Sequence, residues 1–163
     1  KKENFIKLTH KTKFKFKNKS YDKKTFINTV DKSNHLVISS LNLDGNNCRV
    51  RVLSLKNKDI KKNILNIDEV KKSLNYLYKF NNFALIIIKN FDINENNSVL
   101  KFMSSKKETP ANSIRNYGVG AQIIKKIGLN NLILVTKSKK RIVGLDGFGI
   151  KIKKQEIFKW KNV

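Results

Sequence analysis

Two short, uninterrupted apolar runs constrain the fold of this chain more than any other feature. Phe83–Ile88 reads F-A-L-I-I-I and is bounded by asparagines, and Leu132–Thr136 reads L-I-L-V-T. A run of this length without polar alternation is typical of a strand that is buried on both faces. The sequence therefore predicts a sheet whose central strands need apolar cover on both sides.

Two helical segments are predicted to provide that cover. Between Asp68 and Phe80 the apolar residues fall at helical spacing, and Asp68 stands where an N-cap is needed. A second helix is predicted from about Ser113 to Ile127, with Ser113 as its cap and Gly128 closing it in the left-handed conformation. The two glycines inside this helix would each cost about 1 kcal/mol relative to alanine unless close packing requires them.

The remaining strands are predicted from alternation and from turn signals. Lys13–Lys17 (K-F-K-F-K) alternates with period two, which places its phenylalanines on one face. The cluster Asp44–Asn47 is typical of a turn, so residues 35–43 and 49–55 are expected to pair as a hairpin. The other expected elements are a turn at Asn18–Tyr21, strands at Thr25–Val30, His35–Leu43 (with Leu36, Ile38 and Leu41 inward) and Arg49–Leu55, a polar loop at Asp92–Asn97, and a last strand of which Gly147–Ile152 is the beginning.

Length and composition favour one domain, which we assign to residues 1–163. No internal repeat and no linker rich in proline, glycine or serine divides the chain, and no run of about 18 apolar residues could span a membrane. The single cysteine, Cys48, fits a reducing cytoplasm. The chain begins at Lys1 rather than at methionine, so we expect it to be the C-terminal part of a longer protein.

The formal net charge of +24 would ordinarily indicate a nucleic-acid partner. Only four of the 36 basic residues are arginine, however, and lysine, asparagine and isoleucine, which have A/T-rich codons, are all abundant. Lysines act as point charges and lack the bidentate fork that reads bases and grips phosphates. Composition therefore favours mutational bias, and the nucleic-acid binding expected from it is weak, electrostatic and confined to low salt.

The most distinctive stretch begins at Arg115 with R-N-Y-G-V-G-A-Q-I-I, continues with L-V-T at Leu134–Thr136, and ends with R-I-V-G-L-D-G-F-G at Arg141–Gly149. It resembles the C-terminal signature of GTP cyclohydrolase II, which reads R-[DE]-Y-G-[IV]-G-A-Q-I-L, then L-L-T-N-N-P, then K-[IR]-V-G-L-[ED]-G-[YF]-G. That enzyme opens GTP at the start of riboflavin synthesis. The resemblance implies the family's fold, a mixed α/β domain with a central mixed sheet and flanking helices.

The resemblance also implies relics of a nucleotide site. Arg115 matches the arginine that attacks the phosphate, but the position of the family's general base holds Ser113, or Asn112 if one residue is inserted. Neither side chain can accept a proton near neutral pH. The further phosphate or nucleotide contacts implied by matching positions are Arg51, Ser54, Thr136 and Arg141. The basic segment Lys137–Arg141 is either an anion-binding loop or a solvated charge run.

Two parts of the family's machinery are missing. The family holds zinc with three cysteines, whereas here Lys56 stands at the first thiolate position, no C-x-C follows, and Cys48 lies before the matching arginine. His10 and His35 are lone histidines that we interpret as structural. The residues after the central strand, Lys89–Asn94, contain none of the glycines and arginines that wrap GTP in the family. We therefore expect no zinc cofactor and no intact catalytic residue.

These observations lead to one main hypothesis and two alternatives. The main hypothesis is a degenerate GTP cyclohydrolase II-like domain that supports or regulates a fused 3,4-dihydroxy-2-butanone 4-phosphate synthase domain, as a homodimer in the cytoplasm. Such a domain could still bind a phosphate-sized anion weakly. The alternatives are a metal-free enzyme with altered nucleotide chemistry and a lysine-rich, non-specific nucleic-acid binder.

Overall fold

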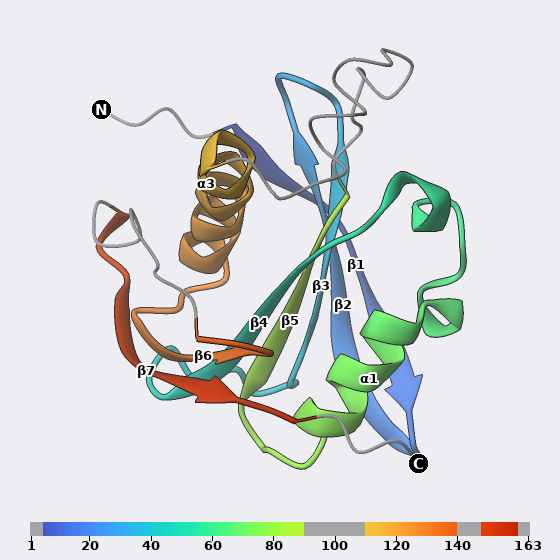
Figure 1. Ribbon diagram of the computed structural model, residues 1–163. Coiled ribbons are helices and arrows are strands. Elements are labelled where there is room, and N and C mark those ends of the chain that lie inside the picture. The colour runs from blue at the N-terminus through green and yellow to red at the C-terminus, as the bar shows by residue number, and fades with distance from the viewer. Residues whose placement is uncertain (1–4, 90–109, 140–147, 160–163) are drawn as a thin grey trace.

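The computed structural model describes residues 5–89, 110–139 and 148–159. In these residues seven strands form one mixed sheet in the order β1-β2-β3-β5-β4-β6-β7 (Figure 1). The strands are β1 (Ile6–Phe16), β2 (Lys19–Asn28), β3 (Asn34–Ser39), β4 (Cys48–Ser54), β5 (Phe83–Ile88), β6 (Asn131–Thr136) and β7 (Lys151–Ile157). The helices are α1 (Asp68–Leu77) and α3 (Pro110–Lys126), with short 3₁₀ turns at Asn57–Asp59 and Ile64–Asn66. The mixed α/β fold predicted from the sequence is confirmed.

The sheet has an antiparallel half and a parallel half. Strands β1, β2, β3 and β5 pair antiparallel in succession. Strand β5 then pairs parallel with β4, β4 with β6, and β6 with β7. The carboxyl ends of β4, β5, β6 and β7 therefore lie at the same edge of the sheet, which is where ligands bind in open α/β sheets.

The two helices lie on opposite faces of the sheet (Figure 1). On one face α1 packs with Leu74 and Leu77 against Leu85 and Ile87. On the other face α3 packs with Ile123 and other apolar residues against the alternate side chains of β5. Every residue of β5 is buried, which confirms the prediction of a central strand with two buried faces. None of the helices in the described residues is long and apolar enough to cross a membrane.

The helices differ from the prediction mainly at their ends. Asp68 is the first residue of α1 rather than its cap, and no side chain caps this helix; the carboxylate still favours the positive end of the helix dipole. In the described residues α3 begins at Pro110, so Ser113 lies inside the helix and is not its cap. Proline suits a first turn because its missing N–H would be unpaired there. Gly128 ends the segment with φ +84°, as predicted.

The predicted hairpin between residues 35–43 and 49–55 is wrong. Strand β5 is inserted between β3 and β4, so the two segments never pair. The intervening loop is instead tied to distant parts of the chain: the Asn82 side chain accepts a hydrogen bond from the Asp44 N–H and donates to two carbonyls of the loop. The Gly45 carbonyl accepts from the N–H groups of Asn130 and Asn131. These hydrogen bonds hold the loop across the end of the sheet at which β5 begins, so that β4 lies on the far side of β5 from β3.

Smaller corrections concern turns and strand ends. The turn between β1 and β2 is formed by Lys17 and Asn18, both with positive φ, so residues 19–21 already belong to β2. Val30 lies beyond the end of β2, and Leu41, expected inward, lies beyond β3 and is 45% exposed. The last strand begins only at Lys151. The predicted loop Asp92–Asn97 lies outside the described residues.

Candidate functional site

The carboxyl edge of the parallel strands brings two of the expected contact residues to one face. Ser54 ends β4 and Thr136 ends β6, and these strands are neighbours in the sheet. The alternate residues Val50 and Leu134 pack in the core under α3. Because side chains alternate along a strand, Ser54 and Thr136 lie on this same α3 face.

Thr136 has an unusual environment. The residue is 5% exposed, and its Oγ1 atom is buried without a hydrogen-bond partner among the described residues. A buried hydroxyl that lacks a partner costs roughly 1–3 kcal/mol. The hydroxyl can donate to an anion or to another acceptor that enters at this edge, and such a partner would remove the cost.

The N-terminal half of α3 approaches the same edge. A Cβ built on Gly120 would lie 3.6 Å from Val52 of β4, two residues before Ser54. The helix runs antiparallel to the strands, so Arg115, five residues earlier, lies about 8 Å further toward the carboxyl edge (Figure 1). The positive end of a helix dipole favours anions. The backbone of Arg115 is thus at the same edge as Ser54 and Thr136; its side chain is not among those described.

Arg51 lies on the opposite face of the sheet. Its Nε donates to Ser73 Oγ of α1 at 2.8 Å and its Nη1 to the Val135 carbonyl at 3.3 Å. The third guanidinium nitrogen, Nη2, lies 3.6 Å from the Glu69 carboxylate, and the guanidinium carbon lies 4.8 Å from the Phe158 ring centroid. The side chain therefore joins β4, α1 and β6. Its role as a nucleotide contact stays a prediction.

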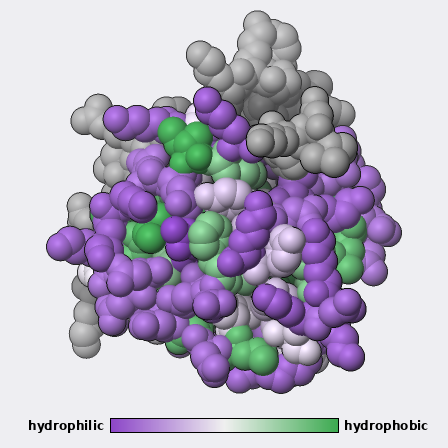
Figure 2. Space-filling model, turned by 90° about the horizontal axis from the view of Figure 1, so that it is seen from below, coloured by the Kyte–Doolittle hydropathy of each residue, from purple (hydrophilic) through white to green (hydrophobic). Residues whose placement is uncertain are grey.

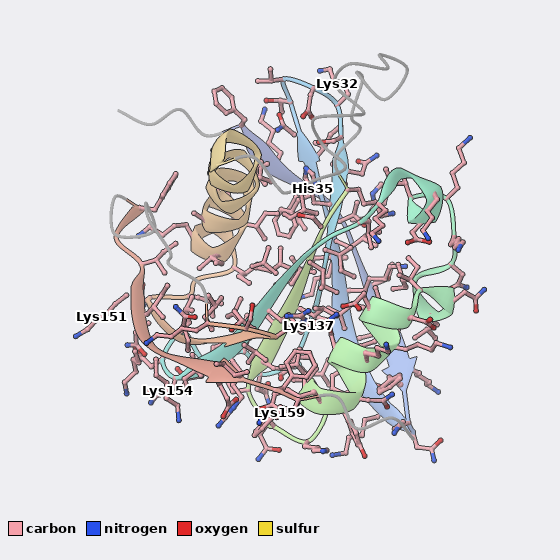
Figure 3. All side chains as sticks on the ribbon, viewed as in Figure 1. Lys32, His35, Lys137, Lys151, Lys154 and Lys159 are labelled. Carbon is pink, nitrogen blue, oxygen red and sulfur yellow. The ribbon has the colours of Figure 1, made fainter. Side chains whose placement is uncertain are left out.

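The basic segment after β6 is described only in part. Lys137 lies at the end of β6 (Figure 3) and forms an ion pair with Glu69 of α1. Arg141, the expected phosphate contact, lies outside the described residues. The described geometry thus puts Ser54, Thr136 and the N-terminal half of α3 on one face at the carboxyl edge and leaves Arg51 on the other face of the sheet.

The residues that the structure describes do not fit the zinc site of the family. Cys48 begins β4, at the edge opposite Ser54 and Thr136, and is fully buried. Burial, followed by the charge of Asp44, raises the pKa of the Cys48 thiol to about 12, so the thiolate that zinc requires is disfavoured. Lys56 is exposed. No three His, Cys, Asp or Glu side chains in the described ranges lie close enough together to hold a metal.

His35 takes part in a buried hydrogen-bond chain that no sequence signal indicated. Its Nδ1 accepts from the Lys89 N–H at 3.0 Å, so the neutral ring carries its proton on Nε2 and donates to Ser33 Oγ at 2.9 Å. The Ser33 hydroxyl then donates to Asp31 at 2.6 Å. Figure 3 places His35 in the interior of the molecule. Burial lowers the His35 pKa to about 4, with Asp31 opposing the shift and Lys89 adding to it. The other histidine, His10, is exposed.

Comparison with known proteins identifies relatives of this chain in riboflavin biosynthesis. A sequence model of the family described as GTP cyclohydrolase II matches residues 7–156. The riboflavin biosynthesis protein RibBA of Bacillus subtilis is 37% identical over 62 residues, which are 38% of this chain and 14% of RibBA. A 3,4-dihydroxy-2-butanone 4-phosphate synthase of Sulfurospirillum multivorans is 41% identical over 61 residues, 37% of this chain and 17% of that protein. The chain thus matches less than a fifth of the length of these relatives.

A solved structure shares the fold. The crystal structure of RibBX, a two-domain 3,4-dihydroxy-2-butanone 4-phosphate synthase from A. baumannii, superposes with a TM-score of 0.62 at 16% sequence identity. The similarity covers 96% of this chain and 41% of RibBX. At this identity the likeness concerns the fold alone. Because the family model spans residues 7–156, almost the whole chain, this protein belongs to the GTP cyclohydrolase II family.

Proposed function

We propose that this domain has lost GTP ring opening and serves as a structural or regulatory module for a 3,4-dihydroxy-2-butanone 4-phosphate synthase domain. The observation that carries the proposal is the donor set. The family resemblance implies three thiolates, and the sequence has one cysteine. That cysteine is buried at the opposite edge of the sheet from Ser54 and Thr136. The described residues therefore do not supply the set of ligands that this zinc ion requires.

The side chains needed for acid–base catalysis of ring opening are missing from the implied positions, as are the zinc ligands. Opening a purine ring by hydrolysis needs an activated water and a group that accepts its proton. The position of the general base implied by the resemblance holds Ser113 or Asn112, and neither has a usable basic group near neutral pH. Arg115 alone remains of the implied catalytic pair. The chain therefore matches the family signature at Arg115–Ile124 without the general base that the resemblance implies for this reaction.

The partner is inferred from the relatives. The matched proteins of Campylobacter jejuni and Sulfurospirillum multivorans are named for the synthase alone, and RibBX is described as a two-domain synthase. Domains of this fold therefore occur in proteins whose names carry only the synthase activity. By analogy with these relatives, we propose that this chain supports such a synthase domain and that it forms a homodimer.

Residual anion binding is part of the same proposal. Thr136 offers a buried hydroxyl without a partner in the described residues, at the edge of the sheet that the N-terminal half of α3 approaches. The residues Lys89–Asn94 contain no glycine or arginine, so a loop that could wrap a triphosphate through its backbone is not expected. The site should hold one phosphate-sized group and bind GTP poorly.

Two measurements test the proposal. The purified protein is assayed for zinc by elemental analysis and for formate release from GTP with and without added zinc. We expect no stoichiometric zinc and no formate above a control without protein. Zinc-dependent formate release would overturn the loss of function, and GTP turnover in the presence of a chelator would instead support a metal-free enzyme.

The supporting role needs a separate measurement. The synthase domain is purified with and without this domain, and its activity, thermal midpoint and molar mass in solution are compared. We expect the synthase to be more stable, or its dimer tighter, when this domain is present. Identical activity, stability and mass in both preparations would show that the domain does not support the synthase.

A further inference from the structure

Strands β1 and β2 and the turn between them are rich in lysine. Eight of the 18 residues between Lys7 and Lys24 are lysine, whereas the whole chain of 163 residues has 36 lysines and arginines. These 18 residues lie within β1, β2 and their turn, which we call the lysine ribbon. Other segments are as dense, since Lys151–Lys161 has five lysines in 11 residues, so density alone does not separate these strands from a mutational bias. What separates them is how their lysines are arranged.

Strand geometry aligns half of these lysines. Phe26 of β2 packs in the core on the α3 face, and regular alternation places Lys24 and Asp22 on that same face. The residues opposite them on β1 are Lys11 and Lys13, and Lys15 follows opposite Ser20. Lys11, Lys13 and Lys15 are exposed. They form a straight row with a spacing of about 7 Å, two residues per step.

Within the described residues, Lys13 is the one member of this row that forms an ion pair with an acidic side chain. Lys11 and Lys24 are directly opposite each other, and like charges in that arrangement destabilise a sheet. Asp22 is the only acidic residue of the ribbon, and it is bonded to Lys13 at 2.8 Å. On the other face of the ribbon, Lys23 contributes to a lowered pKa of Lys89, after the larger effect of burial. A bound anion would relieve this repulsion.

Protection of a sheet edge is the competing explanation. Lysines on an edge strand prevent pairing with another chain, and β1 is an edge strand of the sheet. Strand β2, however, is paired on both sides, with β1 and with β3, and it has no edge to protect. Lys23 and Lys24 are nevertheless part of the ribbon. Edge protection therefore accounts for the lysines of β1 alone.

We propose that the lysine ribbon binds the phosphate backbone of a nucleic acid without sequence preference. A linear row of exposed point charges fits a linear polyanion, and lysine ammonium groups neutralise phosphates without reading bases. Much of the rest of the surface is hydrophilic as well, as Figure 2 shows for one face. What distinguishes the ribbon is the alignment of like charges, which composition alone does not reveal. The inference is independent of the proposed loss of GTP chemistry.

The test compares two variants of equal charge. Lys11→Gln, Lys15→Gln and Lys24→Gln are combined in one variant, which leaves the Lys13–Asp22 ion pair intact. The matched control combines Lys58→Gln, Lys126→Gln and Lys151→Gln, three exposed lysines outside the ribbon. Fluorescence anisotropy with labelled single-stranded RNA and duplex DNA gives the affinity over a range of salt concentrations. Thermal midpoints show that both variants are folded.

The ribbon variant should bind both probes roughly tenfold or more weakly at low salt, and its slope of log K against log salt should fall by about 2. The control should keep an affinity within about threefold of the parent and a slope near that of the parent. Equal losses in both variants would show that only net charge matters and would overturn the proposal. A preference for vesicles of anionic lipid over both nucleic acids, or a strong sequence preference, would overturn it as well.

Discussion

Thr136 is the residue whose substitution tests most directly whether an anion-binding site remains in this domain. Replacing it with valine keeps the shape of the side chain and removes a polar atom that has no partner in the described residues. In phosphate-free buffer we expect Thr136→Val to stabilise the fold by about 1 kcal/mol. In phosphate the parent should gain thermal stability and the variant should not, because the donor is gone.

The control for this measurement is Thr25→Val, on a strand in the antiparallel half of the sheet. Thermal midpoints of the parent and both variants are recorded with and without phosphate. The control should respond to phosphate as the parent does. A phosphate response that survives in Thr136→Val would place the anion elsewhere.

His35 makes the stability of the fold depend on pH. In the folded state its pKa is lowered to about 4 by burial, from an ordinary value of 6.5. Between these values the unfolded chain binds a proton that the folded chain does not, so stability falls as the pH drops through this window. The loss is on the order of 3 kcal/mol when the window has been crossed.

Urea unfolding at several pH values from 7 to 4 checks this expectation for the parent, His35→Asn and His10→Asn. Asparagine at position 35 retains an acceptor for the Lys89 N–H but does not titrate in this range. We expect His35→Asn to be less stable at neutral pH and to depend less on pH. His10 is exposed, so its variant should follow the parent. Parallel pH profiles for all three proteins would contradict the assignment.

At the scale of elements, substitution of two glycines by alanine should change the stability of the fold in opposite directions. A Cβ on Gly45 would lie 2.4 Å from the Gly128 carbonyl oxygen, whereas a Cβ on Gly118 in α3 would meet no atom of the described residues within 4 Å. Gly45→Ala should therefore destabilise the fold by about 1–3 kcal/mol, because two backbone segments must move apart. Gly118→Ala should stabilise it by about 0.5–1 kcal/mol.

The midpoints of urea unfolding distinguish these outcomes. A neutral Gly45→Ala would mean that the loop before β4 does not dock against the end of α3 as described. A destabilising Gly118→Ala would contradict the open surroundings of that residue. A Cβ on Gly120 would lie 3.6 Å from Val52, which is an ordinary van der Waals contact, so among the described residues close packing requires neither of the two helix glycines.

Local sequence patterns predicted which elements form better than they predicted which strands are neighbours in the sheet. The apolar run Phe83–Ile88 and the helical spacing after Asp68 both correspond to observed elements, because each depends on residues close in sequence. The position of β4 depends on contacts of the preceding loop with Asn82 and with Asn130 and Asn131 at the start of β6, which are remote in sequence. A turn signal cannot indicate that another strand will be inserted between the two it connects.

The candidate site was predictable to a similar degree. The family resemblance pointed to Ser54 and Thr136, which the structure brings to one face of the same edge. A spacing of three residues already placed Arg51 on the opposite side of a regular strand from Ser54. The buried state of the Thr136 hydroxyl and the His35 chain arise from tertiary packing, so no local pattern could reveal them.

At the scale of the whole molecule, net charge should limit stability. A charge of +24 on 163 residues makes the folded state repel itself, and salt screens that repulsion. We expect the thermal midpoint to rise between about 20 mM and 200 mM sodium chloride, over which the Debye length falls from about 20 Å to below 10 Å. The rise should be smaller in the ribbon variant than in the Lys58, Lys126 and Lys151 control.

The comparison separates clustered from total charge, because both variants lose three positive charges and differ only in where these charges were. If repulsion is concentrated between directly opposed lysines, as at Lys11 and Lys24, the ribbon variant gains stability at low salt and has less to gain from screening. If repulsion is spread over the molecule, both variants respond alike. A midpoint that falls with salt in the parent would mean that favourable ion pairs, such as Arg49–Glu156, outweigh the net charge.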